Sequence, residues 1–251
     1  MNIVAIIEAR MNSSRLPGKH MLKILEKPIL EYLFDRLKKS VILNDIILAT
    51  TTSSKDDILV NLAIENNIKV FRGSENDVLG RVYNCAKENN VDLIVEISGD
   101  CPLLDWEIMD QTISLYTINQ ADFVSNATIG SFPGGMDVSV FGINALEESN
   151  NNGLSPYNRE HVATYMIDNP AKFSRLNLPA SPQLNRTEIC LALDEHRDYL
   201  FIKEMIEATY IDGSTPKCFD LITAYDGCNN FKEINKSVAR NHNTEKHNCI
   251  K

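Results

Sequence analysis

Apolar runs of strand length alternate with longer amphipathic segments along the first hundred residues of the chain. The runs and segments are, in chain order, residues 3–9, 28–40, 45–51, 55–67, 68–73, 77–90 and 92–98. This βαβα order, with strands that are apolar on both faces, predicts an α/β fold. We expect a mainly parallel, doubly wound mixed sheet that is covered by helices on both sides.

The pattern changes after residue 104, where strands and helices no longer alternate regularly. The elements predicted there are helices over residues 105–119, 157–169 and 197–210, and strands over residues 172–179 and 188–194. Two short strands, "DFVSN" and "MDVSVFG", flank the turn "SFPGG". We expect these elements to add strands to the same sheet.

No linker in the sequence is long enough to divide the chain, and no internal repeat is present. A chain of 251 residues can bury a substantial core without disulfides or a structural metal. We therefore expect one domain over residues 1–238, made of halves at 1–104 and 105–238. Residues 239–251 are polar and are predicted to form a frayed tail.

Charge and composition narrow the class of protein. The net charge of -9 argues against an extended nucleic-acid surface, which would need a basic stripe. Six cysteines are scattered without ligand spacing, so neither a zinc site nor a redox pair is predicted. The sequence shows no leader pattern and no apolar span of about 18 residues, so we expect a cytoplasmic protein without membrane contact.

A basic loop follows the first predicted strand. Its polar side chains are those of Arg10, Ser13, Ser14, Arg15, Lys19 and His20. The loop is neither a Walker A motif nor GxGxxG, but arginine forks, a lysine and free backbone N–H groups can together bind a polyphosphate. Ligands of open α/β sheets bind at this edge, so the loop predicts a nucleoside triphosphate site. The alternative is a solvated loop whose arginines pair with nearby acids.

Acidic residues follow two other predicted strands. Asp100 comes after a buried strand and a glycine, where a carboxylate can hold Mg²⁺ together with water and substrate phosphates. Asp105 directly precedes a helix and is better explained as its N-cap. Asp194 ends the strand predicted over residues 188–194, and on composition alone it is equally a metal ligand or an N-cap.

Taken together, these residues resemble a known family. The opening "AIIEARMNSSRLPGKHMLKILEKPILEYLFDRL" is similar to that of the cytidylyltransferases that activate acidic sugars, the acylneuraminate and 3-deoxy-manno-octulosonate enzymes. The closest likeness is to their spore-coat polysaccharide relatives. Resemblance continues at "FRGSENDVLGRVY", "ISGDCPLLD", "FPGGMDVSVF", "NREHVATY" and "LALDEHRDYLFI", so it covers nearly the whole chain.

The resemblance implies a nucleotide-diphospho-sugar transferase fold of the GT-A type. It also implies a Mg²⁺-dependent transfer of CMP from CTP to a sugar, with release of pyrophosphate, for a surface glycan. Residues 1–104 would then form the nucleotide-binding half, and residues 105–238 the half for sugar binding and dimerisation. A homodimer is expected.

The resemblance also implies roles for the residues of this chain that match the family's motifs. Arg10, Arg15 and Lys19 match the family's triphosphate-binding residues, with Ser13 and Ser14 in the turn of the loop. Asp100 matches the aspartate of the "GDxPL" motif, and Asp194 matches the first aspartate of "DTPEDL"; both are metal ligands in the family. The residues expected around the nucleoside are Arg72, Ser74, Asp77 and Arg81.

The sequence departs from the family motifs at two places. "DEHRDYL" stands where "DTPEDL" is expected, which weakens the second metal site, and Glu8 replaces a proline or glutamine and is expected to orient Arg10. The residues expected to bind the sugar are Asp137, Arg159, Glu160 and His161. Arg159 would meet a carboxylate, whereas Asp137 suits a hydroxyl or an amine.

Three alternatives stay open at this point. A guanylyl or uridylyl transferase usually opens with a glycine-rich turn, whereas this loop has one late glycine. A GT-A glycosyltransferase normally carries a DxD motif after a strand, and none of these acids is so placed. A catalytically degenerate binding homologue would have lost basic or acidic residues that this chain keeps.

Overall fold

The computed structural model describes residues 1–119, 121–211 and 213–236. The predicted tail at 239–251 and the last two residues of the predicted domain lie outside this range. The division of the chain into two halves stays a prediction.

A seven-stranded sheet forms the centre of the molecule, with strand order β5-β4-β1-β6-β8-β7-β9. Its strands are β1 (Ile3–Glu8), β4 (Asp45–Thr51), β5 (Lys69–Gly73), β6 (Leu93–Ser98), β7 (Phe123–Ser125), β8 (Ser139–Gly142) and β9 (Arg175–Asn177). β1 pairs in parallel with β4 and β6, and β8 is antiparallel to β6 and β7. The predicted mainly parallel, mixed sheet is therefore confirmed. A separate hairpin joins β2 (Lys23–Ile24) and β3 (Lys27–Pro28).

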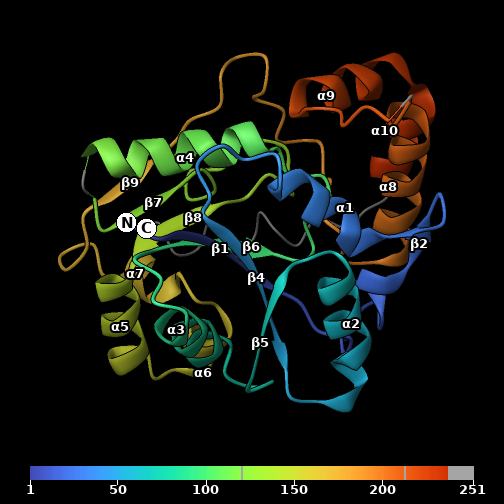
Figure 1. The fold of residues 1–251 in the computed structure, drawn as a ribbon. Helices are drawn as coiled ribbons and strands as arrows, with labels where there is room; N and C mark the ends of the chain where they lie inside the picture. The colour runs from blue at the N-terminus through green and yellow to red at the C-terminus, as the bar shows by residue number, and fades with distance from the viewer. Residues whose placement is uncertain (120, 212, 237–251) are drawn as a thin grey trace.

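Helices cover both faces of the sheet (Figure 1). The helices are α1 (Ile29–Leu37), α2 (Asp57–Glu65), α3 (Val78–Glu88), α4 (Trp106–Asn119), α5 (Ile143–Asn152), α6 (Pro156–Glu160), α7 (Thr164–Asp168), α8 (His196–Thr209), α9 (Cys218–Gly227) and α10 (Asn229–Lys236), with 3-10 turns η1 (Lys19–Met21) and η2 (Ser54–Asp56). α1, α2 and α4 pack on one face, and α3, α5 and α7 pack on the other. α8, α9 and α10 surround a third core beside the sheet.

Strand β1 shows why the first half folds as its pattern predicts. Ala5 and Ile7 enter the core beneath α1 and α2, whereas Val4 and Ile6 enter the core beneath α3. All four side chains are buried. Each fully buried valine or isoleucine stabilises the fold by about 1.5–3 kcal/mol, so a strand that is apolar on both faces is fixed at the centre of the sheet.

The strand predicted over residues 188–194 is absent, and this prediction was wrong. Cys190 forms a single isolated bridge with Gly134, and the amide of Leu193 donates to the carbonyl of Asp100 at 2.8 Å. Apolar side chains of the segment do enter the third core, but the backbone partners are loops. The hydrogen bond from Leu193 places Asp194 beside Asp100.

The helix predicted over residues 157–169 is also wrong, because the chain forms two short helices, α6 and α7. The break falls at His161, whose φ of -119° and ψ of 100° are extended. It allows Val162 to be buried in the core beneath α3 while Arg159 of α6 reaches Asp77.

The capping role predicted for Asp105 is confirmed. Its Oδ1 accepts a hydrogen bond from the amide of Glu107 at 2.8 Å, in the first turn of α4. Its Oδ2 accepts from the amide of Cys218 at 2.7 Å, so the same carboxylate holds the start of α9. Among the described helices, none is both long enough and apolar enough to cross a membrane.

Candidate active site

The basic loop leaves the carboxyl end of β1 and folds back on itself. The amide of Gly18 donates to the carbonyl of Met11 at 2.9 Å, and Gly18 has a φ of 74°, which favours glycine. The amide of Met11 donates to Oδ1 of Asp56 at 2.7 Å. This closed loop delivers Lys19 to the first position of η1.

Asp56 is a residue that the sequence interpretation missed. Its side chain is buried, and besides Met11 it accepts hydrogen bonds from the hydroxyl of Thr50 at 3.2 Å and from the amide and hydroxyl of Thr51. It therefore ties the basic loop to the end of β4. In the sequence, "SSKDD" looks like an ordinary helix start, so nothing distinguishes Asp56 from its neighbour Asp57.

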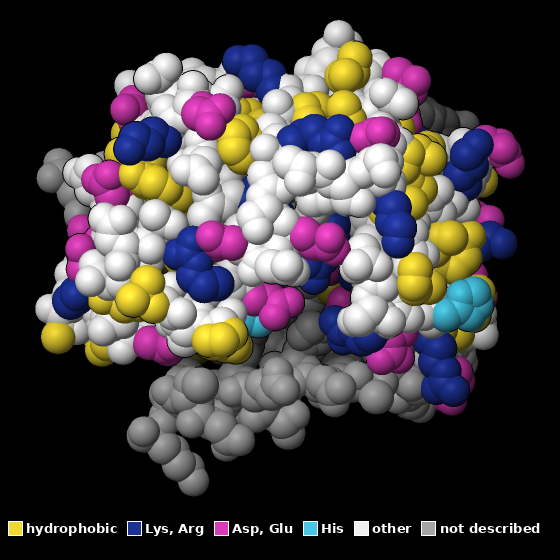
Figure 2. All heavy atoms as spheres, turned by 90° about the horizontal axis from the view of Figure 1, so that it is seen from below, with side chains coloured by type: hydrophobic (Ala, Val, Ile, Leu, Met, Phe, Trp, Pro, Cys, Tyr) yellow, Lys and Arg dark blue, Asp and Glu magenta, His cyan; other side chains and the backbone are white. Residues whose placement is uncertain are grey.

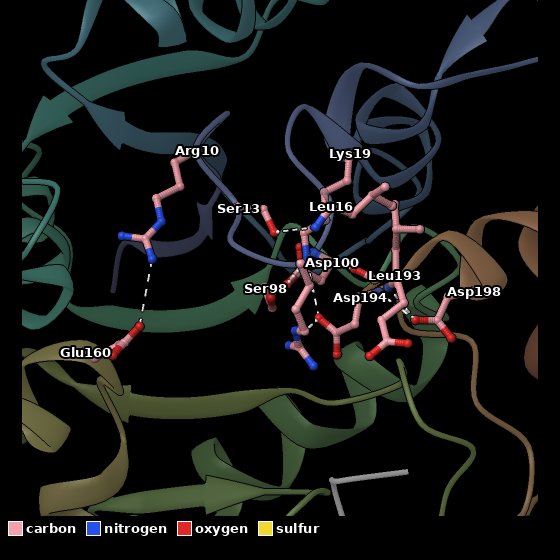
Figure 3. Close-up of polar contacts among 12 residues, drawn as sticks. Arg10, Ser13, Leu16, Lys19, Ser98, Asp100, Glu160, Leu193, Asp194 and Asp198 are labelled. Atoms are coloured by element: carbon pink, nitrogen blue, oxygen red, sulfur yellow. Dashed lines mark hydrogen bonds and ion pairs between the residues drawn. The ribbon is translucent and has the colours of Figure 1, made fainter. Parts of the chain in front are cut away.

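Lys19 is buried, with 5% of its surface exposed, and its ammonium group lies among three oxygens. The nitrogen Nζ is 2.7 Å from the carbonyl of Leu193, 2.8 Å from Oδ2 of Asp100 and 3.3 Å from Oδ1 of Asp194. Figure 3 shows these residues gathered from three separate segments. The structure thus brings together the predicted cation and both predicted metal ligands.

Arg15 approaches the same cluster from the surface side. Its Nη2 lies 2.8 Å from Oδ1 of Asp194, and about half of the Arg15 side chain is exposed. Ser13 accepts a hydrogen bond within the loop from the amide of Leu16, at 3.4 Å, and Ser14 is exposed. Arg15 and the serines are therefore accessible to a ligand.

Asp198 explains how Asp194 is held despite the altered motif. Oδ2 of Asp198 accepts from the amide of Asp194 at 2.8 Å and from that of Glu195 at 2.7 Å. Glu195, not Asp194, is the N-cap of α8, so the capping alternative for Asp194 does not hold. The "DEHRDYL" segment thus keeps Asp194 in place without the Thr-Pro turn.

His20 lies beneath the cluster and is 3% exposed. Its Nε2 is 3.6 Å from Oδ1 of Asp100, and burial lowers the pKa of its imidazole. Gly99 allows this packing, since a Cβ there would lie 2.8 Å from the carbonyl of Glu8 and 3.1 Å from His20. The glycine before Asp100 therefore has a steric reason.

Arg72, which is expected near the nucleoside, makes its contacts within residues 1–104 of the chain. It donates to the carbonyls of Thr51 at 2.8 Å and Ser53 at 2.7 Å, and it pairs with Asp57 at 2.7 Å. These contacts connect β5 to the start of α2.

Glu8 meets a different arginine from the one expected. Burial raises the pKa of Glu8 to about 7, Arg81 opposes this rise and Asp100 adds to it. Arg81 is itself buried and donates to the carbonyl of Ser74 at 2.5 Å. The prediction that Glu8 orients Arg10 was wrong, because the cation that acts most strongly on Glu8 is Arg81.

Arg10 turns toward the second half of the chain. Its Nη1 donates to the carbonyl of Glu75 at 3.1 Å, and its Nη2 lies 3.8 Å from Oε1 of Glu160. In Figure 3 this pair lies apart from the Lys19 cluster. Both side chains are partly exposed, so the ion pair is weak and can open for a ligand.

Asp77 and Arg159, which were expected to contact different substrates, contact each other. Arg159 donates from Nε to Oδ1 of Asp77 at 2.7 Å and from Nη2 to Oδ2 at 2.5 Å. Its Nη1 donates to the carbonyl of Asn150 at 3.0 Å, and Asp77 also caps α3 by accepting from the amide of Gly80 at 2.8 Å. This bidentate pair connects α3 to α6.

The remaining sugar-site candidates are exposed. His161 lies against the ring of Tyr157, with ring centres 4.7 Å apart, at the end of α6. Asp137 is exposed, and its charge acts on Cys101, as do the charges of Asp100 and Asp194. Burial is the main cause that raises the pKa of the Cys101 thiol, and these three charges add to it, so Asp137 borders the acidic cluster.

Asp100 and Asp194 can hold a metal only with help from other ligands. Within the described residues, no group of three or more histidine, cysteine or acidic side chains is arranged to bind a metal. Two carboxylates that share one ammonium ion do match the needs of Mg²⁺, which takes its other ligands from water and phosphate oxygens.

On the face seen in Figure 2, basic and acidic side chains are intermingled.

The profile of the cytidylyltransferase family matches residues 4–239, so the chain belongs to this family. Spore coat polysaccharide biosynthesis protein SpsF of Bacillus subtilis is 30% identical over 82% of the chain and 87% of its own length. The 8-amino-3,8-dideoxy-manno-octulosonate cytidylyltransferase of Shewanella pealeana is 27% identical over 71% of the chain and 67% of its own length. A cytidylyltransferase structure from Leptospira borgpetersenii superposes with a TM-score of 0.87 at 33% identity, covering 94% of this chain and 98% of that one.

Proposed function

We propose that the protein is a Mg²⁺-dependent cytidylyltransferase that transfers CMP from CTP to a sugar hydroxyl for polysaccharide biosynthesis. The observation that carries this proposal is the meeting of Lys19 and Arg15 with Asp100 and Asp194 at the carboxyl edge of the sheet. Family membership supports the reaction, and the names of the relatives support a sugar acceptor.

The reaction forms one bond and breaks one. An oxygen of the sugar attacks the α-phosphorus of CTP in line, the bond from that phosphorus to the bridging oxygen breaks, and pyrophosphate leaves. The hydroxyl proton passes to solvent. Arg10, Arg15 and Lys19 offset the charge that grows on the leaving pyrophosphate, so positioning and electrostatics supply the catalysis, with no covalent enzyme intermediate.

The metal would be held by Asp100 and Asp194, with water and phosphate oxygens as its other ligands. When bound, Mg²⁺ supplies positive charge to the phosphate oxygens of CTP. The residues of this chain that orient the two carboxylates are Leu193, whose amide binds the carbonyl of Asp100, and Asp198, which binds the amide of Asp194.

For the acceptor we propose an acidic sugar, as the name of the Shewanella relative suggests. The second half of the chain would bind it through Glu160 and His161 on α6 and through Asp137. Arg159 is engaged with Asp77 and Asn150, so we assign it to positioning α6 and not to contact with the sugar carboxylate.

The proposal also includes a homodimer in the cytoplasm. Both features rest on the family. Sedimentation at micromolar protein concentration would test the dimer, and a profile of pure monomer would contradict it.

The test is pyrophosphate release with CTP, UTP, GTP and ATP, each with Mg²⁺ and a mixed pool of acidic and neutral sugars. The expected result is a CTP-selective signal that is much weaker in the Asp100→Asn variant at the same Mg²⁺ concentration. A signal with UTP or GTP would overturn the base assignment. If none of the four nucleotides gives pyrophosphate release and calorimetry detects no CTP binding, the protein is better explained as a homologue that has lost catalytic activity.

A further inference from the structure

Lys19 is enclosed by three oxygens inside the protein. Its Nζ donates hydrogen bonds to the carbonyl of Leu193 and to Oδ1 of Asp194, and it forms an ion pair with Oδ2 of Asp100. The side chain is only 6% exposed. To contact a phosphate oxygen, this enclosed ammonium group must therefore move away from at least one of the three oxygens.

Two of the three oxygens belong to the carboxylates that would hold the metal. A cation that contacts both carboxylates has to lie between them, and that is where Nζ lies, 2.8 Å from Asp100 and 3.3 Å from Asp194. The metal and the ammonium group are both positively charged, and no solvent layer separates them at this distance. The two cations therefore compete for the same pair of carboxylates.

Arg15 adds to this competition from the solvent side. Its Nη2 lies 2.8 Å from the same Oδ1 of Asp194 that faces Lys19. Half of the Arg15 side chain is exposed, whereas Lys19 is buried, so Lys19 is the stronger competitor.

We propose that Lys19 is the internal counter-ion of Asp100 and Asp194, and that it makes metal binding depend on the nucleotide. The triphosphate draws the ammonium group away from the carboxylates, and the same movement opens them to the metal. Metal and nucleotide then bind with positive coupling, and the protein alone has little affinity for a free divalent cation. This inference rests on the proposed function, because it takes the triphosphate as the ligand of Lys19.

The experiment is a titration with Mn²⁺ alone, without nucleotide, followed by the electron paramagnetic resonance signal of the free ion. Wild type is compared with Lys19→Met, whose unbranched side chain is one heavy atom shorter than that of lysine and carries no charge. We expect Lys19→Met to bind Mn²⁺ at least about tenfold more tightly than wild type, within the usual range of such couplings. Lys23→Met, at an exposed lysine of β2, is the matched control and should bind as wild type does.

A second variant locates the bound ion. The double variant Lys19→Met/Asp100→Asn should bind Mn²⁺ less tightly than Lys19→Met alone, because it has lost one of the two carboxylates. Equal or weaker Mn²⁺ binding by a folded Lys19→Met protein, with folding checked by circular dichroism, would overturn the inference. If Lys19→Met does not fold, Lys19→Gln, which is polar but uncharged, replaces it; the same direction of change is expected, and no gain in Mn²⁺ binding overturns the inference.

Failure of the proposed function gives a different result. If wild type releases pyrophosphate from CTP while Lys19→Met shows no gain in Mn²⁺ binding, the counter-ion role is wrong and the activity stands. If wild type neither binds nor uses CTP while Lys19→Met binds Mn²⁺ more tightly, the competition is real and the nucleotide assignment is wrong.

Discussion

The ammonium nitrogen of Lys19 lies 2.8 Å from Oδ2 of Asp100, although one residue follows β1 and the other follows β6. These two strands are parallel neighbours, and Glu8 at the end of β1 lies opposite Ser98 at the end of β6. The loops that follow them must therefore leave the sheet at the same edge. The pairing of the strands is what brings the two charges together.

Replacing Lys19 tests its place in the reaction. We expect Lys19→Met to lower kcat for pyrophosphate release by about a hundredfold or more, because a positioned cation beside the leaving group is lost. Lys23→Met should leave turnover unchanged. Turnover by Lys19→Met within twofold of wild type would remove Lys19 from the mechanism.

Replacing Asp100 tests the metal assignment. Asp100→Asn should raise the Mg²⁺ concentration for half-maximal activity by about tenfold or more, since a neutral amide binds Mg²⁺ less well than a carboxylate. Asp168→Asn, at an exposed position at the end of α7, is the control. The same Mg²⁺ dependence in Asp100→Asn and wild type would contradict the role of Asp100.

The pair of Asp77 and Arg159 is expected to stabilise the contact between α3 and α6. Asp77→Asn and Arg159→Met should each lower the free energy of unfolding by about 1–2 kcal/mol, through loss of charged hydrogen bonds. The double variant should lose less than the sum, with a coupling of about 1 kcal/mol, because the pair is partly exposed. Urea unfolding measures these values, and strict additivity would show that the pair does not act as a unit.

Glu8 should make stability depend on pH. In the folded protein, burial raises the pKa of its carboxyl from the ordinary 4.5 to about 7. The charged groups that act on it are Arg81 and Asp100, and Glu8 in turn helps to raise the pKa of Glu96. Below pH 4.5 the proton is bound in both states, and between pH 4.5 and 7 only the folded protein keeps it.

The stabilisation from this proton is therefore lost as the pH rises toward 7. We expect wild type to lose about 3 kcal/mol relative to Glu8→Gln between pH 5 and pH 8. Urea unfolding of both proteins at the two pH values measures the difference. Parallel pH profiles for the two proteins would show that the carboxyl titrates normally.

Gly135 lies where a side chain has no room. Its φ is 89°, and a Cβ there would lie 2.7 Å from the carbonyl carbon of Leu191. Gly135→Ala should lower the free energy of unfolding by about 3 kcal/mol, from backbone strain and overpacking combined. Gly130 is the matched control, because its φ is also positive while the nearest atom to an added Cβ is 3.9 Å away. A loss of about 1 kcal/mol is expected for Gly130→Ala, and equal losses at both sites would exclude the crowding at Gly135.

Much of the fold could be predicted because each element depends on residues that are close in the sequence. The apolar positions of residues 3–9 predict a central strand, and Asp105 before an amphipathic segment predicts a helix start; both predictions are confirmed. The parallel arrangement also placed the basic loop and Asp100 at one edge of the sheet. Local periodicity and the parallel order of the strands therefore determined the fold class and the position of the candidate site.

Only the tertiary structure decided which charged groups meet. The apolar run within residues 188–194 predicted a strand, but the backbone there bonds to loops, and that bonding sets Asp194 beside Asp100. The sequence likewise assigned Asp77 and Arg159 to separate ligands, whereas the fold pairs them. A charged side chain carries no information in the sequence about which distant partner it will contact. That partner is fixed by packing between segments far apart in the chain, after the core has formed.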